Sequence, residues 1–302
     1  MPLPAKSATD MPERQSLFLS PYFIGVLAIF FAACMNTSIK GLSANESVII
    51  ITAWRYLFGA IYAGLLWLAF RPEPIGLRGA PFHLFRGAFQ VAAAGLFFWA
   101  VTQIPLATAG ALGLTGTLMI GPLAWVLLGE TMTKQVFLGT LAGFAGAWYI
   151  VFSETDILLG DFSEHLLGYL APMLASLCLS VSVVLLRFRA QTESPIVIAF
   201  FANTLPALYV LPIFFMLEIN LSVLQLSGYA LAGFFGLGYW TCTTFAYARA
   251  PAARIAPLTN TNLIFASIMG FVFFNEIPPL STWIGAIIIV IACIYVARVK
   301  EV

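Results

Sequence analysis

Residues 105–130 read PLATAGALGLTGTLMIGPLAWVLLGE, and residues 251–276 read PAARIAPLTNTNLIFASIMGFVFFNE. The two stretches align without a gap at a spacing of 146 residues, and the alignment extends to 100–150 on 246–296. Identical residues at matched positions include Pro105 and Pro251, Leu112 and Leu258, Thr115 and Thr261, and Glu130 and Glu276. The chain therefore consists of two related halves.

Apolar segments long enough to cross a membrane fill most of the chain. Hydrophobic residues make up 61% of the sequence and charged residues 9%, whereas soluble domains are about 25% charged. A spanning helix needs about 20 mostly apolar residues. The predicted spans are 20–39, 48–70, 85–103, 105–128, 136–153, 166–187, 196–217, 227–248, 252–274 and 281–298. Because these runs are continuous, they predict an all-α integral membrane protein with ten transmembrane helices and not a barrel.

The basic residues indicate how the chain is oriented. With the N-terminus in the cytoplasm, all of the 14 Lys and Arg residues except Lys40 and Arg55 fall on the cytoplasmic side. The link 154–165 holds acids but no Lys or Arg, and it falls on the opposite side. This bias predicts that both termini are cytoplasmic.

Parity makes the repeat an inverted one. The predicted divisions are a cytoplasmic leader (1–19), a first five-helix repeat (20–153), an extracytoplasmic linker (154–165) and a second five-helix repeat (166–302). Because each repeat holds an odd number of spans, the second enters the membrane from the opposite side. Inverted repeats are a common plan of secondary transporters, which bind substrate near the midplane between the halves.

The chain resembles the EamA family of the drug/metabolite transporter superfamily. The matching features are Trp54-Arg55-Tyr56-Leu57-Phe58-Gly59 in the second span, and the stretches from Ala100 to Glu130 and from Ala246 to Glu276. The resemblance covers nearly everything after residue 20. It implies a bacterial inner-membrane carrier that moves small organic solutes, often outward, through a cavity between the halves. The family includes amino-acid exporters and carriers of vitamins and S-adenosylmethionine.

Arg55 is the exceptional charge because it lies inside a predicted span, roughly 10 Å from its outer end. One interpretation is an anion or carboxylate contact at the outer mouth of the cavity. The other is a structural residue that snorkels or pairs with Glu46 or Glu276. The family pattern also carries a basic residue here, which favours a shared structural role.

The eighth span carries Trp240, Thr243, Thr244 and Tyr247 on one helix face, at i, i+3, i+4 and i+7. Such a face suits a cavity wall that stacks on a solute and hydrogen-bonds to it. It equally suits a packed interface whose Thr hydroxyls bond to their own helix. The matched positions of the first repeat are Ala94, Phe97, Phe98 and Val101. The repeat itself therefore does not require the stripe.

Further polar groups are expected at membrane depth. Thr259-Asn260-Thr261-Asn262 follows Pro257, which indicates either a locally irregular helix that binds substrate or a set of interhelical hydrogen bonds. Asn36, Gln90 and Asn203 are single polar residues in other spans. The predicted substrate-binding residues are Asn36, Arg55, Gln90, Asn203, Trp240, Thr243, Thr244, Tyr247, Asn260 and Asn262.

Acids are missing from the middle third of every predicted span, where proton-coupled carriers keep a relay group. Facilitated diffusion or exchange is then the simplest interpretation, with sodium sites built from backbone carbonyls left open. Glu130 and Glu276, expected at opposite faces, are predicted gate or cap residues. A neutral wall of rings, amides and hydroxyls suits a zwitterion or a planar, weakly charged solute. Phosphate esters would call for clustered Lys and Arg.

Several classes of function are disfavoured. The four Cys residues lie within spans, as apolar packing groups do, and the two His residues are far apart, so no metal site and no cofactor are expected. A net charge of +1 gives no reason to expect nucleic acid. We find no acid/base or nucleophile constellation for an enzyme, and no soluble segment long enough for a sensor domain. The expected partners are a small-molecule substrate and the lipid bilayer.

The leading hypothesis is an amino-acid exporter that works by alternating access or exchange. The alternative is an uptake carrier for a ring-containing vitamin or an S-adenosylmethionine-like solute. The aromatic stripe of the eighth span fits both.

Overall fold

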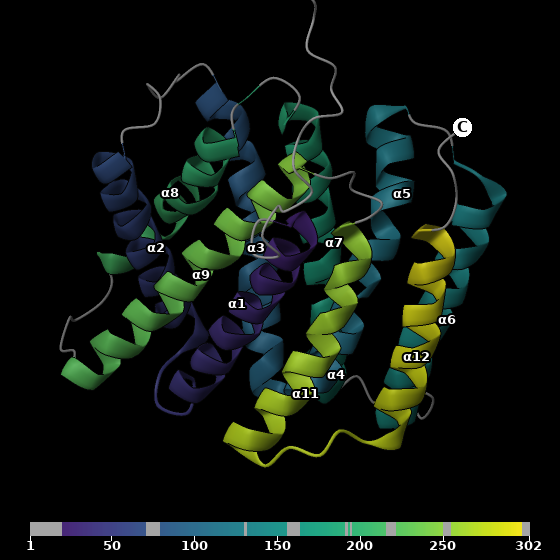
Figure 1. The fold of residues 1–302 in the computed structure, drawn as a ribbon. Coiled ribbons are helices and arrows are strands. Elements are labelled where there is room, and N and C mark those ends of the chain that lie inside the picture. The colour runs from purple at the N-terminus through teal and green to yellow at the C-terminus, as the bar shows by residue number, and fades with distance from the viewer. Residues whose placement is uncertain are drawn as a thin grey trace, which may run out of the picture.

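The computed structural model describes residues 20–70, 79–129, 132–155, 164–190, 193, 195–215, 222–249 and 255–297. Regular structure in these residues is helical, without strands, as the apolar runs predicted (Figure 1). The helices of the first half are α1 (Pro21–Leu42), α2 (Val48–Phe70), α3 (Ala80–Gln103), α4 (Leu106–Gly113), α5 (Thr115–Leu128) and α6 (Lys134–Glu154). The second half has α7 (Glu164–Ala190), α8 (Pro195–Phe214), α9 (Val223–Arg249), the 3-10 helix η4 (Ala256–Asn260), α11 (Thr261–Phe274) and α12 (Leu280–Ala297).

Seven described stretches are long and apolar enough to cross a membrane. They comprise α1, α2, α3, the α4–α5 pair, α6, α7 and α8, while the η4–α11 stretch and α12 are shorter apolar helices. Helix α9 has 27 residues, but its Gly, Tyr, Trp and Thr residues lower its hydropathy. The chain is thus a multi-pass membrane protein.

Several predicted boundaries need correction. Helix α3 begins at Ala80, five residues before the predicted start of the third span, and α7 extends to Ala190. The leader 1–19, most of the linker 154–165 and the predicted start of the ninth span at residue 252 lie outside the described residues.

The fourth predicted span is broken, and not one continuous helix as expected. At the break, the N–H of Leu114 donates to Ala111 O (3.1 Å) and the N–H of Thr117 donates to Leu114 O (3.0 Å). These are tight bonds of the 3-10 type in place of the usual α-helical pattern. In the second half, η4 gives way to α11 after Asn260, at the position that matches Leu114. Both halves therefore interrupt the same helix at the same place.

The helices of the two halves pack mainly against each other. Helix α1 lies along α9, and its counterpart α7 lies along α3 (Figure 1). Likewise α2 packs on α9 as α8 packs on α3, and α1 packs on α11 as α7 packs on α5. Helix α6 lies along its own counterpart α12. This exchange of partners is the pattern of a pseudo-two-fold axis between inverted repeats.

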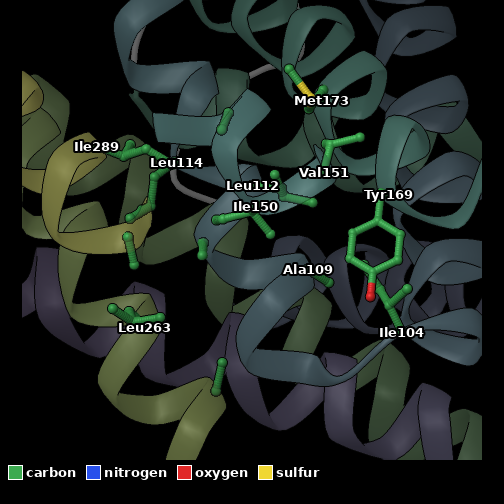
Figure 2. Close-up of a cluster of buried hydrophobic side chains, with 14 of the residues drawn as sticks. Ile104, Ala109, Leu112, Leu114, Ile150, Val151, Tyr169, Met173, Leu263 and Ile289 are labelled. Atoms are coloured by element: carbon green, nitrogen blue, oxygen red, sulfur yellow. The ribbon is translucent and has the colours of Figure 1, made fainter. Parts of the chain in front are cut away.

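The largest apolar cluster joins the break in the first half to α6, α7, α11 and α12 (Figure 2). Leu112, Leu114 and Ile150 are fully or almost fully buried there. At the α6–α12 interface, a methyl group added to Gly285 would lie 2.7 Å from the carbonyl oxygen of Gly146. Glycines let these two helices approach closely, as small residues do in membrane helix packing.

Candidate functional site

A cavity of about 220 Å³ lies between the two halves. Its wall is formed by α1, α2, α3, the α4–α5 break, α7, α9, η4 and α11. The wall runs along α1 from Gly25 to Asn36 and along α9 from Tyr239 to Tyr247. The cavity therefore occupies the centre of the bundle and extends toward the end at which α1 begins and α9 ends.

The wall repeats along with the sequence. On α1 and α7, matched wall residues at a spacing of 147 are Ala28 and Ala175, Ile29 and Ser176, Ala32 and Leu179, and Asn36 and Val183. The same face of the first helix in each half thus lines the cavity, while the polar groups differ between the halves.

The two helix breaks both lie beside the cavity. The hydroxyl of Thr115 donates to Leu112 O (2.7 Å), and that of Thr261 donates to Leu258 O (2.6 Å). These side-chain bonds occupy carbonyls that a regular helix would bond to a backbone N–H further along the chain, so they favour the irregular turns. Gly113 and Thr259 line the cavity at the two breaks. The helix after Pro257 is thus irregular, as one of the two interpretations required, while its role in substrate binding stays a prediction.

Side chains of α7 and η4 hold the first break in place. Ser176 Oγ donates to Gly113 O (2.9 Å), and Ser180 Oγ donates to Gly116 O (2.8 Å). The hydroxyls of Thr117 and Thr259 lie 2.9 Å apart and join the two breaks directly. The breaks are therefore coupled to each other across the interface between the halves.

The structure brings seven of the ten predicted substrate-binding residues to this one cavity. They are Asn36, Arg55, Gln90, Trp240, Thr243, Tyr247 and Asn262. These residues come from α1, α2, α3, α9 and α11. Residues that are distant in the sequence thus share one wall.

The other three predicted residues do not line the cavity. Asn203 Nδ2 donates to Ala199 O (2.8 Å), and Thr244 Oγ1 donates to Trp240 O (2.8 Å), both within their own helices. Asn260 stands at the start of α11, outside the wall. For Thr244, the alternative of a hydroxyl bonded to its own helix is the one that the structure shows.

Arg55 is buried, with 4% of its surface exposed, and lines the cavity. Its guanidinium carbon lies 3.9 Å from the ring centre of Tyr56 and 5.3 Å from that of Phe98. Among the described residues, the suggested ion pair with Glu46 or Glu276 does not form, because Glu46 accepts from Gln225 and Glu276 pairs with Lys40. The interpretation of Arg55 as a structural residue paired with Glu46 or Glu276 is therefore wrong about the partners.

Several wall residues escaped the sequence analysis. They are Tyr56, Thr117, Ser176, Ser180 and Tyr239. Ser176 and Ser180 recur at i, i+4 within an apolar span, which is the same signal that singled out the eighth span. Tyr56 follows Arg55 directly, and only the packing of α2 against α3 shows that it faces the cavity.

A second polar cluster joins α3 to α7 near the beginning of α3. His83 Nε2 lies 2.5 Å from Glu193 Oε2, and Arg189 Nη1 lies 3.5 Å from Glu193 Oε1. Arg86, predicted on the cytoplasmic side at the start of the third span, is completely buried and reaches Ser182 Oγ at 3.4 Å. Three or more His, Cys, Asp or Glu side chains suited to a metal ion do not come together in the described part of the chain.

Glu276, a predicted gate or cap residue, joins the end of α1 to the start of α4. Its carboxylate pairs with Lys40 of α1 and accepts the N–H of Leu106 (2.9 Å), while Lys40 also donates to Ile104 O (3.0 Å). Asn275, just before it, adopts a left-handed conformation (φ 54°) that ends α11. The matched residue of the first half, Gly129, is also left-handed (φ 70°). Glu130, the predicted counterpart of Glu276, lies outside the described residues.

Known proteins similar to this chain are transporters. The pseudopaline exporter CntI of Pseudomonas aeruginosa is 27% identical over 94% of this chain and 98% of its own length. A riboflavin transporter of Brucella anthropi is 25% identical over 91% and 96% of the two chains. An S-adenosylmethionine uptake transporter of Rickettsia prowazekii is 25% identical over 71% and 70%.

The fold also has a solved relative. A crystal structure at 19% identity superposes with a TM-score of 0.61 and covers 91% of this chain and 94% of the other. The profile of the EamA-like transporter family matches residues 19–152 and again 166–298. These matches confirm the resemblance read from the motifs and cover both repeats. The chain therefore belongs to the EamA-like transporter family.

Proposed function

We propose that this protein is a secondary transporter of small organic metabolites in a bacterial inner membrane, most simply an amino-acid exporter. The cavity between the two inverted halves, flanked by matched helix breaks, is the observation that carries the proposal. In secondary transporters, broken helices at the repeat interface form the substrate site near the midplane. The α4–α5 and η4–α11 stretches each cross the membrane once as interrupted helices, which makes ten crossings in all.

The proposed alternating-access cycle includes this arrangement as its cytoplasm-facing state. With both termini in the cytoplasm, the Lys40–Glu276 pair closes the extracytoplasmic end. The cavity wall ends at Asn36, one turn before Lys40, and extends toward the cytoplasmic end of α9. Solute enters from the cytoplasm in this state. The two similar halves then exchange conformations, which opens the other end.

The contents of the wall support a metabolite as the cargo. Trp240, Tyr239 and Tyr247 provide rings, while Asn36, Gln90 and Asn262 provide amides. No Asp or Glu side chain lies in the described wall. Exchange or facilitated diffusion therefore remains the simplest energetics, since a proton relay in the cavity would need such a group.

The alternative cargo is a ring-containing vitamin or an S-adenosylmethionine-like solute, taken up and not exported. The rings of Tyr239 and Trp240, which both line the cavity, suit a planar solute. The relatives that carry riboflavin and S-adenosylmethionine support this alternative, and the pseudopaline exporter supports export.

Counterflow in liposomes tests the proposal. The purified protein is reconstituted and loaded inside with one unlabelled candidate, and the labelled form is added outside without an ion gradient. The candidates are the common amino acids, riboflavin and S-adenosylmethionine. Uptake of one class supports a carrier and identifies its cargo. If the folded protein exchanges none of them, the proposed cargo classes are wrong.

A further inference from the structure

The cavity wall carries a single charged side chain. Arg55 is the one charged residue among the described residues that line it, since no Asp, Glu, Lys or His takes part. The sequence predicted a neutral wall, with Arg55 either as an anion or carboxylate contact at the outer mouth or as a structural residue. The structure instead buries Arg55 in the wall itself, together with Tyr56 and Phe98.

Aromatic rings and a glycine surround the guanidinium of Arg55, and no acid pairs with it among the described residues. Its guanidinium lies against the faces of Tyr56 and Phe98, and a methyl group on Gly236 would lie 3.0 Å from Arg55 Nη1. Tyr56 is itself fixed, because its hydroxyl donates to Gln90 O (3.1 Å). Arg55 Nε has no hydrogen-bond partner among the described residues. A buried cation without a paired anion is costly unless a counter-charge completes it.

Amide groups around the same cavity also have side-chain atoms without hydrogen-bond partners among the described residues. Both side-chain atoms of Gln90, which is 2% exposed, are buried without a partner in the described structure. The Oδ1 atoms of Asn36 and Asn262 are in the same condition. Buried amides in proteins are normally hydrogen-bonded. Polar groups of this kind, converging on one cavity from α1, α3 and α11, indicate a ligand that has both donors and acceptors.

We propose that Arg55 binds a carboxylate of the transported solute, and that the amides of Gln90, Asn36 and Asn262 bind its other polar groups. This inference rests on the proposed transport function and specifies its substrate class. A planar guanidinium matches a carboxylate with two parallel hydrogen bonds. One cation balances one negative charge, whereas phosphate esters call for more basic groups. The amide oxygens accept from the ammonium of a zwitterion, so an amino acid or a related carboxylic acid fits.

The assignment separates riboflavin from the amino-acid and S-adenosylmethionine-like cargoes. Riboflavin has no carboxylate and would leave Arg55 without a counter-charge. Amino acids and other monocarboxylates provide one. The cavity should therefore select for the carboxylate first and for the remaining side chain second.

A ligand series that differs only in the carboxyl and amino groups tests the proposal. The probes are L-phenylalanine, 3-phenylpropionate, L-phenylalaninamide and phenethylamine, measured by thermal unfolding of the purified protein and by competition in counterflow. We expect the two acids to bind and the amide and amine to bind at least about tenfold more weakly, as loss of a charge-assisted hydrogen bond implies. Arg55→Gln should remove this preference, and Arg55→Lys should keep part of it.

Two further variants keep the test decisive. Arg249→Gln removes the same charge from the exposed end of α9, outside the cavity wall, and should retain the preference for acids. Gln90→Met removes a buried amide that has no described partner, so the fold should tolerate it even if Arg55→Gln unfolds, while binding of the acids weakens several-fold. The proposal is overturned if the amide binds as well as the acid, if neither acid binds, or if Arg55→Gln and Gln90→Met bind the acids like the wild type. Exchange of riboflavin but of no acid would keep the carrier function and refute the carboxylate site.

Discussion

Thr115 and Thr261 make the same hydrogen bond at matched positions of the two halves. Each donates its hydroxyl to the carbonyl oxygen of the leucine three residues earlier, at 2.7 Å for Leu112 and 2.6 Å for Leu258. The identity of these residues in the two repeats thus has a structural cause, because the pair marks the point at which the helix is interrupted. The interruption brings Asn262 and the first turn of α5 to the cavity.

Replacing Thr261 by Val should slow transport about two- to tenfold, the range that corresponds to one hydrogen bond. Valine keeps the shape of the side chain but frees Leu258 O, which favours a regular helix and moves Asn262 away from the cavity. Counterflow rates measure the effect. Thr102→Val is the matched control, because Thr102 donates to Trp99 O with the same spacing (2.7 Å) outside the cavity wall. Equal rates in the two variants would show that the break does not matter.

The Lys40–Glu276 pair should stabilise the closed state of the proposed extracytoplasmic gate. Both side chains are mostly buried, with 14% and 17% exposed. Glu276→Gln keeps an oxygen that can accept the N–H of Leu106 but loses the charge, so it isolates the ion pair. We expect Glu276→Gln and Lys40→Met each to cost about 1–3 kcal/mol of stability, with a double variant that costs less than their sum.

The measurement is a double-mutant cycle by thermal or denaturant unfolding. It is combined with labelling, by an impermeant reagent added outside, of a single cysteine introduced into the cavity wall of a variant that lacks the four native Cys residues. Loss of the pair should increase labelling, since the closed state is then less populated. Additive effects on stability together with unchanged labelling would contradict the assignment of a gate.

The helices and their ends could be predicted because their signals lie in residues that are neighbours in the sequence. Gly129 and Asn275 are two residue types that readily adopt a left-handed conformation, and both end their helices in this way. The shared acid that follows is predicted to be a gate or cap; Glu276 pairs with Lys40, and its role as a gate stays a prediction. Span length and charge bias are local or additive properties as well, so the helices and the repeat could be read without coordinates.

The surroundings of single arginines could not be read in this way. Arg86 was predicted on the cytoplasmic side, at the very start of a span beginning at residue 85, but α3 begins at Ala80 and Arg86 therefore lies inside the helix. Its neighbour Ser182 lies 96 residues away in the sequence. Arg55 likewise depends on Phe98 and Gly236 from other helices. Such contacts arise from the packing of distant helices, which one sequence does not specify.

The close contact between α6 and α12 should tolerate no side chain larger than hydrogen at its centre. A methyl group on Gly285 would lie 2.3 Å from Ile150 Cγ1 and 2.7 Å from Gly146 O. We expect Gly285→Ala to destabilise the protein by about 1–3 kcal/mol through overpacking. Gly64→Ala is the control, because nothing lies within 4 Å of the added methyl. Thermal unfolding should show a lower midpoint for the first variant alone, and equal midpoints would contradict the close approach.

Trp240 should contribute more to the binding of ring-containing solutes than to that of aliphatic ones. Its side chain is 4% exposed and lines the cavity beside Tyr239. Trp240→Ala removes a stacking surface, while Trp240→Phe keeps part of it. Aromatic pairs contribute about 0.5–1.5 kcal/mol beyond burial, so the Ala variant should lose affinity for phenylalanine several-fold more than affinity for alanine. Counterflow competition with both amino acids measures the ratio.

The Phe variant separates this role from a structural one. Truncation of a buried Trp costs about 3–5 kcal/mol of stability, so transport by Trp240→Ala alone would mix folding with binding. If Trp240 is part of the binding wall, Trp240→Phe should stay folded and keep most of the preference for phenylalanine, while Trp240→Ala loses it even after correction for the folded fraction. Equal losses for both amino acids would instead assign Trp240 a structural role, since its ring also lies 5.8 Å from the guanidinium carbon of Arg86.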